Sequence, residues 1–185
     1  MNKEYYVYLC SYIFLIMDIF TLIMPSNGIY KSINYYIVIW FIILHFSFLV
    51  LYIKEIYKGI KSRNYVSINY WLHIFIYLLG YIFLLLNNYN NYYGIICSIL
   101  FIIGTLALLY SSILNGDLYY LKNTNTNILK NEKLYIFWGS IYSLIGSIVF
   151  SYSISNDSPL AYKFVMICFV IARIYLLAES KRYIK

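Results

Sequence analysis

Residues 92–114 read YYGIICSILFIIGTLALLYSSIL, and no charged side chain occurs between Tyr92 and Leu114. A helix of about 20 apolar residues crosses the hydrocarbon of a bilayer, which is roughly 30 Å thick. Inside lipid every backbone polar group needs a partner within the protein, and a helix supplies these partners within its own segment. This stretch therefore predicts a transmembrane helix.

Five further apolar stretches have a comparable length, and we expect them to cross the membrane as well. The six predicted spans are residues 5–24, 33–53, 66–86, 92–114, 134–154 and 160–178. None of them alternates apolar and polar residues with period two, which argues against the strands of a β-barrel. The sequence predicts an all-α, polytopic integral membrane protein in which residues 1–185 form a single membrane domain of six helices.

The overall composition favours the same class. Hydrophobic residues make up 63% of the chain and charged residues 11%, whereas a soluble domain carries roughly 25% charged residues. A soluble fold of this length could not hide so much apolar surface, because exposed apolar patches rarely exceed a few hundred Å². The net charge of the chain is +7. The Lys and Arg residues lie between apolar runs rather than on one face of a soluble domain, so the expected partner is the lipid bilayer and not nucleic acid.

The basic residues are distributed unevenly over the predicted loops. One side of the membrane receives both termini and the two long loops, with Lys3, Lys54, Lys58, Lys61, Arg63, Lys122, Lys130, Lys133, Lys181, Arg182 and Lys185. The other side receives Lys31 and Lys163. Because loops on the cytoplasmic side carry the excess of Lys and Arg, we expect both termini on the cytoplasmic side of a bacterial inner membrane or the matrix side of an organelle inner membrane.

The fifth predicted span contains a regular stripe of small side chains. Its members recur every four residues: Gly139, Ser143, Ser147, Ser151 and Ser155. Such stripes let a neighbouring helix approach closely, and the Ser hydroxyls can form hydrogen bonds across the contact. The stripe favours packing within the chain. A docking face for a partner subunit or a second copy is the alternative, and a polar translocation path is a third interpretation.

Four ionisable side chains interrupt the apolar runs, namely Asp18, His45, His73 and Arg173. A charge near the centre of a bilayer costs a few kcal/mol or more, so each should face the bundle interior or reach an interface. At about 1.5 Å per residue, Arg173 lies about 8 Å and Asp18 about 20 Å from the inner ends of their helices. Because these depths differ by about 12 Å, we expect Arg173 to extend toward the inner interface. Whether it pairs with Asp18 stays open at this point.

The two histidines allow two interpretations. His45 and His73 are compatible with a neutral, hydrogen-bonded role in helix packing. A proton relay through His73, His45 and Asp18 is the alternative, because imidazoles and carboxylates inside membranes often carry protons.

Familiar catalytic signatures are missing from the sequence. We find no H-E-x-x-H, P-loop, G-x-S-x-G or dinucleotide fingerprint, and Cys10, Cys97 and Cys168 are too scattered for a metal-ligand pattern. The sequence therefore predicts no catalytic residue, no metal site and no cofactor, and an enzyme is less expected than a non-enzyme.

Three functions remain compatible with the sequence. The first is a non-enzymatic membrane subunit that packs beside other membrane proteins, or beside a second copy, through the small-residue stripe. The second is a small transporter or permeant-binding component, which predicts a cavity lined by several of Asp18, His45, His73 and Arg173. The third is an intramembrane lipid-modifying enzyme, which needs at least two polar catalytic groups within hydrogen-bond reach.

Overall fold

The structure is a computed structural model that describes residues 3–23, 29–87, 92–115, 134–156 and 158–181. Within these residues the chain forms helices and no strand. The helices are α1 (Lys3–Ile23), α2 (Ile29–Leu51), α3 (Ile53–Lys61), α4 (Tyr65–Leu86), α5 (Tyr92–Leu114), α7 (Tyr135–Asn156) and α8 (Pro159–Lys181). The all-α polytopic class predicted from the sequence is confirmed.

Long apolar helices occur at the six stretches where membrane spans are predicted. In the described residues, α1, α4, α5, α7 and α8 are each long and apolar enough to cross a membrane. The remaining candidate is a bent pair, because α2 and α3 pass the same test together and meet at an angle of 58°. The described residues therefore contain five candidate spans, or six when the bent pair is counted as one.

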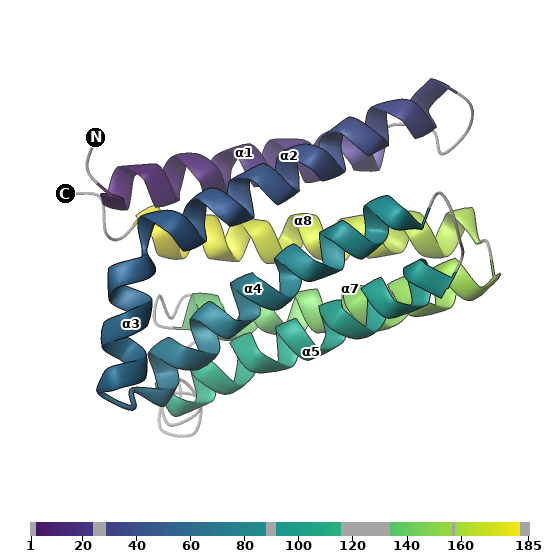
Figure 1. Ribbon diagram of the computed structural model, residues 1–185. Coiled ribbons are helices and arrows are strands. Elements are labelled where there is room, and N and C mark those ends of the chain that lie inside the picture. Colours follow the sequence, from purple (N-terminus) through teal and green to yellow (C-terminus); the bar gives the residue numbers. More distant parts are fainter. Residues whose placement is uncertain (1–2, 24–28, 88–91, 116–133, 157, 182–185) are drawn as a thin grey trace.

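The six long helices form a closed ring. Neighbours around it follow the order α1, α2, α4, α5, α7 and α8, and α8 packs against α1 to complete the circle. Figure 1 shows these helices running alongside one another, with α3 lying across one end of the bundle. We call this end, where α1 begins and α8 ends, the basic end, because α3 carries Lys54, Lys58 and Lys61 there.

The outward face of the ring is apolar. Large hydrophobic side chains on different helices are more than one third exposed, among them Trp40, Phe46, Ile103, Ile148 and Ile174. Exposed apolar area of this extent is unfavourable in water but matches the hydrocarbon of a bilayer. The arrangement supports placement as an integral membrane protein.

Helices α4 and α5 approach closely because each supplies a glycine to receive a ring from the other. A Cβ atom on Gly80 would lie 2.6 Å from the ring of Phe101, and one on Gly104 would lie 2.7 Å from the ring of Tyr77. Small residues at a membrane helix interface permit this kind of close contact. The paired glycines fix how far apart the two helices lie.

Helix α3 differs from the expected charged loop. Lys54, Lys58 and Lys61 are exposed along it, and Tyr57 is exposed beside them. A Cβ atom on Gly59 would lie 2.8 Å from Ser67 Oγ, so α3 packs directly against the start of α4. The expected basic residues Lys122, Lys130, Lys133, Arg182 and Lys185 lie outside the described residues.

Candidate functional site

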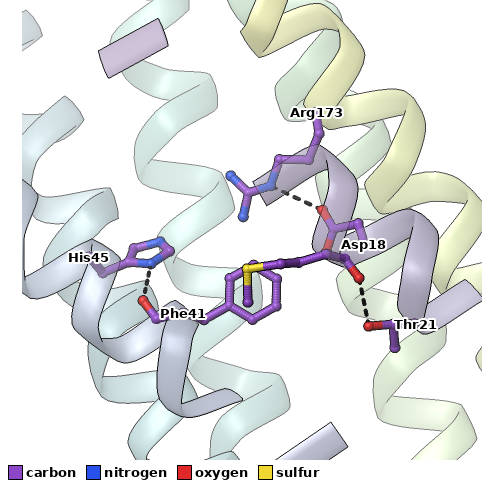
Figure 2. Close-up of polar contacts among 6 residues, drawn as sticks. Asp18, Thr21, Phe41, His45 and Arg173 are labelled. Carbon is purple, nitrogen blue, oxygen red and sulfur yellow. Dashed lines mark hydrogen bonds and ion pairs between the residues drawn. The ribbon is translucent and has the colours of Figure 1, made fainter. Parts of the chain in front are cut away.

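Arg173 on α8 and Asp18 on α1 form an ion pair inside the helix ring. Arg173 Nε donates to Asp18 Oδ2 over 3.2 Å, and the two side chains are 15% and 5% exposed. The guanidinium carbon of Arg173 also lies 4.6 Å from the centroid of the Phe14 ring. Figure 2 shows both charged side chains reaching into the same space. Opposite charges here compensate one another where hydrocarbon would penalise each alone.

This contact differs from the expectation that Arg173 extends to the inner interface. That expectation placed the ends of both helices at one level and compared only their Cα positions. In the structure α8 continues to Lys181, beyond the predicted end at residue 178, and α1 begins at Lys3, before the predicted start at residue 5. The long arginine side chain then bridges the remaining rise to Asp18.

His45 on α2 is 4% exposed and lies among aromatic rings. Its centroid is 4.9 Å from that of Phe14 and 5.1 Å from that of Tyr81. Its Nδ1 lies 2.8 Å from the carbonyl oxygen of Phe41, which can only accept, so Nδ1 carries the hydrogen and donates. In a neutral imidazole Nε2 is then an acceptor. Figure 2 shows this second nitrogen on the side of the ring that faces Arg173.

His73 on α4 belongs to a chain of buried polar groups. Its Nδ1 donates across the helix interface to the carbonyl oxygen of Gly104 on α5, over 3.0 Å. The neighbouring Tyr77 hydroxyl lies 3.0 Å from Thr105 Oγ1, and Thr105 Oγ1 lies 3.3 Å from Ser147 Oγ. These contacts join α4, α5 and α7 at the middle of the ring.

Both histidines are thus hydrogen-bonded to backbone carbonyls. No hydrogen bond connects His73, His45 and Asp18 to one another in the part of the chain that the structure describes. The packing role predicted for the histidines agrees with these bonds, whereas the proton relay stays a prediction.

Three of the four intramembrane candidates line a single cavity, which we call the large cavity. It measures about 510 Å³, and Arg173, His45 and His73 contribute to its wall. Its apolar wall contains Phe14, Phe48, Trp71, Ile74, Leu108 and Leu176. Residues at helix ends, such as Asn64 and Asn115, also line it, so it extends from the middle of the ring toward the basic end.

A second space, the small cavity, lies toward the opposite end of the ring. It measures about 180 Å³ and is lined by Asp18, Phe41, Tyr81 and Asn87, among others. The Asn87 side-chain oxygen is buried and makes no hydrogen bond to any described residue. The two cavities adjoin the same layer of side chains, because the Phe14 ring of the large cavity stacks on the Phe41 ring of the small cavity, 5.3 Å away.

The glycine of the α7 stripe is covered by α8. A Cβ atom on Gly139 would lie 3.3 Å from the carbonyl oxygen of Ala172. The adjacent small residue Gly146 faces α8 as well, where a Cβ atom would lie 3.1 Å from the ring of Phe169. This side of the stripe therefore packs within the chain.

The serines of the stripe also point into the ring. Ser147 is 0% exposed and Ser143 is buried, while Ser151 Oγ accepts a hydrogen bond from Ser98 Oγ on α5 over 3.3 Å. Of Ser155 the structure describes only the backbone. The buried members of the stripe face α5 and α8, which leaves no surface at Gly139 or Ser147 for a second protein.

Some contributors to the site were not singled out from the sequence. Phe14, Tyr77 and Thr105 hold the charged and polar groups in place, yet they resemble the many other aromatic and hydroxyl residues of the spans. Their spacing in the sequence could have identified two of them. Tyr77 follows His73 by one helical turn and Phe14 precedes Asp18 by one, so each lies on the same helix face as the ionisable residue. Among the described residues, no three His, Cys, Asp or Glu side chains gather as metal ligands do.

No protein family model, curated protein or solved structure matches this chain. Its function is therefore argued from the cavities and from the charged and polar groups that line them.

Proposed function

We propose that the protein binds a small solute in the large cavity and acts as a transporter or as the permeant-binding component of one. The observation that carries this proposal is the meeting of Arg173, His45 and His73 at the wall of one cavity of about 510 Å³. Ligand cavities typically measure about 300–1,000 Å³ and combine apolar walls with a few polar groups. Ionisable residues inside a membrane commonly mark the path of a substrate.

The basic end is placed on the cytoplasmic or matrix side in this proposal. Lys54, Lys58, Lys61 and Arg63 are all exposed at that end, and such clusters are typical of the cytoplasmic side. The large cavity then receives its solute from, or releases it to, that compartment. The ion pair between Asp18 and Arg173 separates it from the small cavity on the other side.

Membership of a larger complex stays a prediction. It needs a contact surface other than the α7 stripe, because Gly139 and Ser147 are already covered within the chain. An enzymatic role has less support still, since His45 and His73 are each bonded to a backbone carbonyl and Arg173 Nε to Asp18.

The proposal can be tested by the reactivity of a cysteine placed in the cavity wall. Ser11 lines the large cavity, whereas its neighbour Tyr12 is 47% exposed on the lipid side of the same helix. Ser11→Cys and Tyr12→Cys are prepared in protein whose native cysteines have been replaced by alanine, and both are reconstituted in nanodiscs. Iodoacetamide, which is uncharged, reacts with thiolates that water can reach.

We expect iodoacetamide to modify Ser11→Cys and to leave Tyr12→Cys largely unreacted. Four aromatic solutes of similar size are then added as probes: benzoate, phenyl phosphate, benzyl alcohol and benzyltrimethylammonium. At least one should slow the modification of Ser11→Cys in a saturable manner. An unreactive Ser11→Cys, or a reaction that none of the four probes slows, would contradict solute binding in this cavity.

A further inference from the structure

The guanidinium group of Arg173 uses only part of its hydrogen-bonding capacity. Of its five N–H donors, the one on Nε is directed to Asp18 Oδ2. The two Nη groups make no hydrogen bond to any residue in the described part of the chain. Figure 2 shows these outer nitrogens pointing away from Asp18, toward the space beside His45. Four donors of this cation thus have no acceptor among the described residues.

These donors are available to a molecule that enters the cavity, because the Arg173 nitrogens are not among the fully buried atoms that lack a hydrogen bond in the described residues. Hydrogen bonds in which the donor is ionised are stronger than those between neutral groups, so an anionic acceptor is favoured at these donors. Arg173 lines the large cavity, so an occupant of the cavity can reach the Nη groups. A guanidinium edge presents two parallel N–H groups that fit the oxygens of a carboxylate or a phosphate.

The neighbouring groups narrow the class of occupant. His45 and His73 each donate from Nδ1 to a backbone carbonyl, so in their neutral form neither adds a positive charge. The carboxylate of Asp18 lies on the far side of the guanidinium from the Nη groups (Figure 2) and contacts Nε alone. Recognition therefore depends on the N–H donors of the two Nη groups rather than on a large positive field. The wall beyond is mixed: Phe48, Leu108 and Leu176 are apolar, whereas Ser111, Asn115 and the acidic Glu179 line it toward the basic end.

We infer that the large cavity accepts an organic oxyanion, a carboxylate or phosphate group attached to an apolar body, whose oxygens accept hydrogen bonds from the Nη groups of Arg173. This inference rests on the proposed function and names the chemical class of its ligand. The oxyanion belongs either to a water-soluble organic acid or to the headgroup of an anionic lipid. Both sources present the same acceptor oxygens to Arg173.

The cysteine protection assay on Ser11→Cys distinguishes the oxyanion from other ligands. We expect benzoate and phenyl phosphate to slow the iodoacetamide reaction at concentrations about tenfold lower than benzyl alcohol or benzyltrimethylammonium require, a ratio equal to about 1.4 kcal/mol. Equal protection by all four probes, or preferential protection by the cation, would overturn the inference while leaving solute binding intact. Failure of all four probes is the result that contradicts the proposed function itself.

Variants of the ion pair test whether the preference for the anionic probes depends on Arg173. In the double variant Asp18→Asn, Arg173→Gln no charge is left buried, and the two amides can still form a hydrogen bond. We expect this protein to keep its protection by benzyl alcohol and to lose the tenfold preference for the two anions. Arg173→Lys retains the charge without the paired donors and should reduce the preference by several-fold. A preference unchanged in the double variant would place the anion elsewhere and overturn the inference.

Nanodiscs of defined composition separate the two sources of the oxyanion. A ligand that is a lipid headgroup should be present already in phosphatidylglycerol nanodiscs, where the anionic probes then protect less than in phosphatidylcholine nanodiscs. Equal protection in both membranes identifies a water-soluble acid. Native mass spectrometry of the protein released from each nanodisc checks for retained phosphatidylglycerol. Either result supports the oxyanion class, provided that the preference over benzyl alcohol is observed in phosphatidylcholine.

Discussion

Arg173 and Asp18 are joined by an ion pair of 3.2 Å, yet they line different cavities. Arg173 contributes to the wall of the large cavity toward the basic end, and Asp18 to that of the small cavity toward the opposite end. The pair therefore lies at the partition between two spaces along the axis of the helix ring. A change that separates the two side chains alters the packing of α1 on α8 and the boundary between the cavities at once.

Removing one member of this pair should destabilise the protein strongly. Asp18→Ala leaves the Arg173 charge without its partner inside the ring, and breaking a buried pair in this way costs about 3–5 kcal/mol. The free energy of unfolding, measured by titration of mixed micelles with SDS, should fall by a comparable amount. The double variant Asp18→Leu, Arg173→Met should recover most of the loss, because no charge is then left buried.

Lys163→Met is the matched control for this comparison, since it removes an exposed charge from the same helix as Arg173. We expect it to change the free energy of unfolding by less than about 0.5 kcal/mol. If Asp18→Ala were no more destabilising than Lys163→Met, the ion pair would have no role in holding α1 against α8.

The sequence predicted the spans well because a membrane constrains length and hydropathy directly. It did not predict the pairing of Asp18 with Arg173, because depth along a helix was estimated from Cα rise alone and neither helix tilt nor side-chain reach can be read from one sequence. The hydrogen bond from His73 to Gly104 could not be predicted from the sequence either, because it depends on which helices are neighbours in the ring. Helix α3 was missed for a different reason, because its lysines suggested a loop although Ile53, Tyr57 and Ile60 recur at helical spacing.

Gly104 should not tolerate even a methyl group. The added Cβ atom would lie 2.7 Å from the ring of Tyr77, whose hydroxyl is held by Thr105 and so resists displacement. We expect Gly104→Ala to lower the free energy of unfolding by about 1–3 kcal/mol, as overpacking in a core does. In a Tyr77→Leu background the same substitution should cost clearly less. An equal cost in both backgrounds would show that Tyr77 is not the residue that excludes the methyl group.

The hydrogen bond from His73 to Gly104 should make a smaller contribution. His73→Phe keeps a ring between α4 and α5 but removes the Nδ1 donor. Hydrogen bonds between membrane helices contribute about 0.6 kcal/mol on average and up to about 1.7 kcal/mol, so we expect a loss within this range in the SDS titration. The loss for His73→Phe is compared with that for Asp18→Ala in the same titration. A loss as large as that of Asp18→Ala would show that His73 makes further stabilising contacts besides this hydrogen bond.

The exposed lysines of α3 predict the orientation of the protein in the membrane. Ser62 lies beside them and is exposed, whereas Lys163 is exposed near the start of α8 at the opposite end of the ring. In protein without native cysteines, expressed in a bacterial inner membrane, a membrane-impermeant maleimide should label Ser62→Cys in inverted vesicles and Lys163→Cys in right-side-out vesicles. The reverse pattern would place the basic end outside and contradict the positive-inside assignment.

Ser147 distinguishes packing within the chain from docking of a partner. Its side chain is 0% exposed, and its hydroxyl contacts Thr105 Oγ1 across the interface with α5. Ser147→Leu should therefore destabilise the isolated protein by about 1–3 kcal/mol or more, because the added carbons have no space there. Ile148→Trp, one residue away on a side chain that is 54% exposed, should leave the free energy of unfolding nearly unchanged. If Ser147→Leu instead preserved the stability of the monomer and abolished co-purification of another protein, the stripe would be an intermolecular contact. The covering of Gly139 by Ala172 would then have to open for the partner to bind.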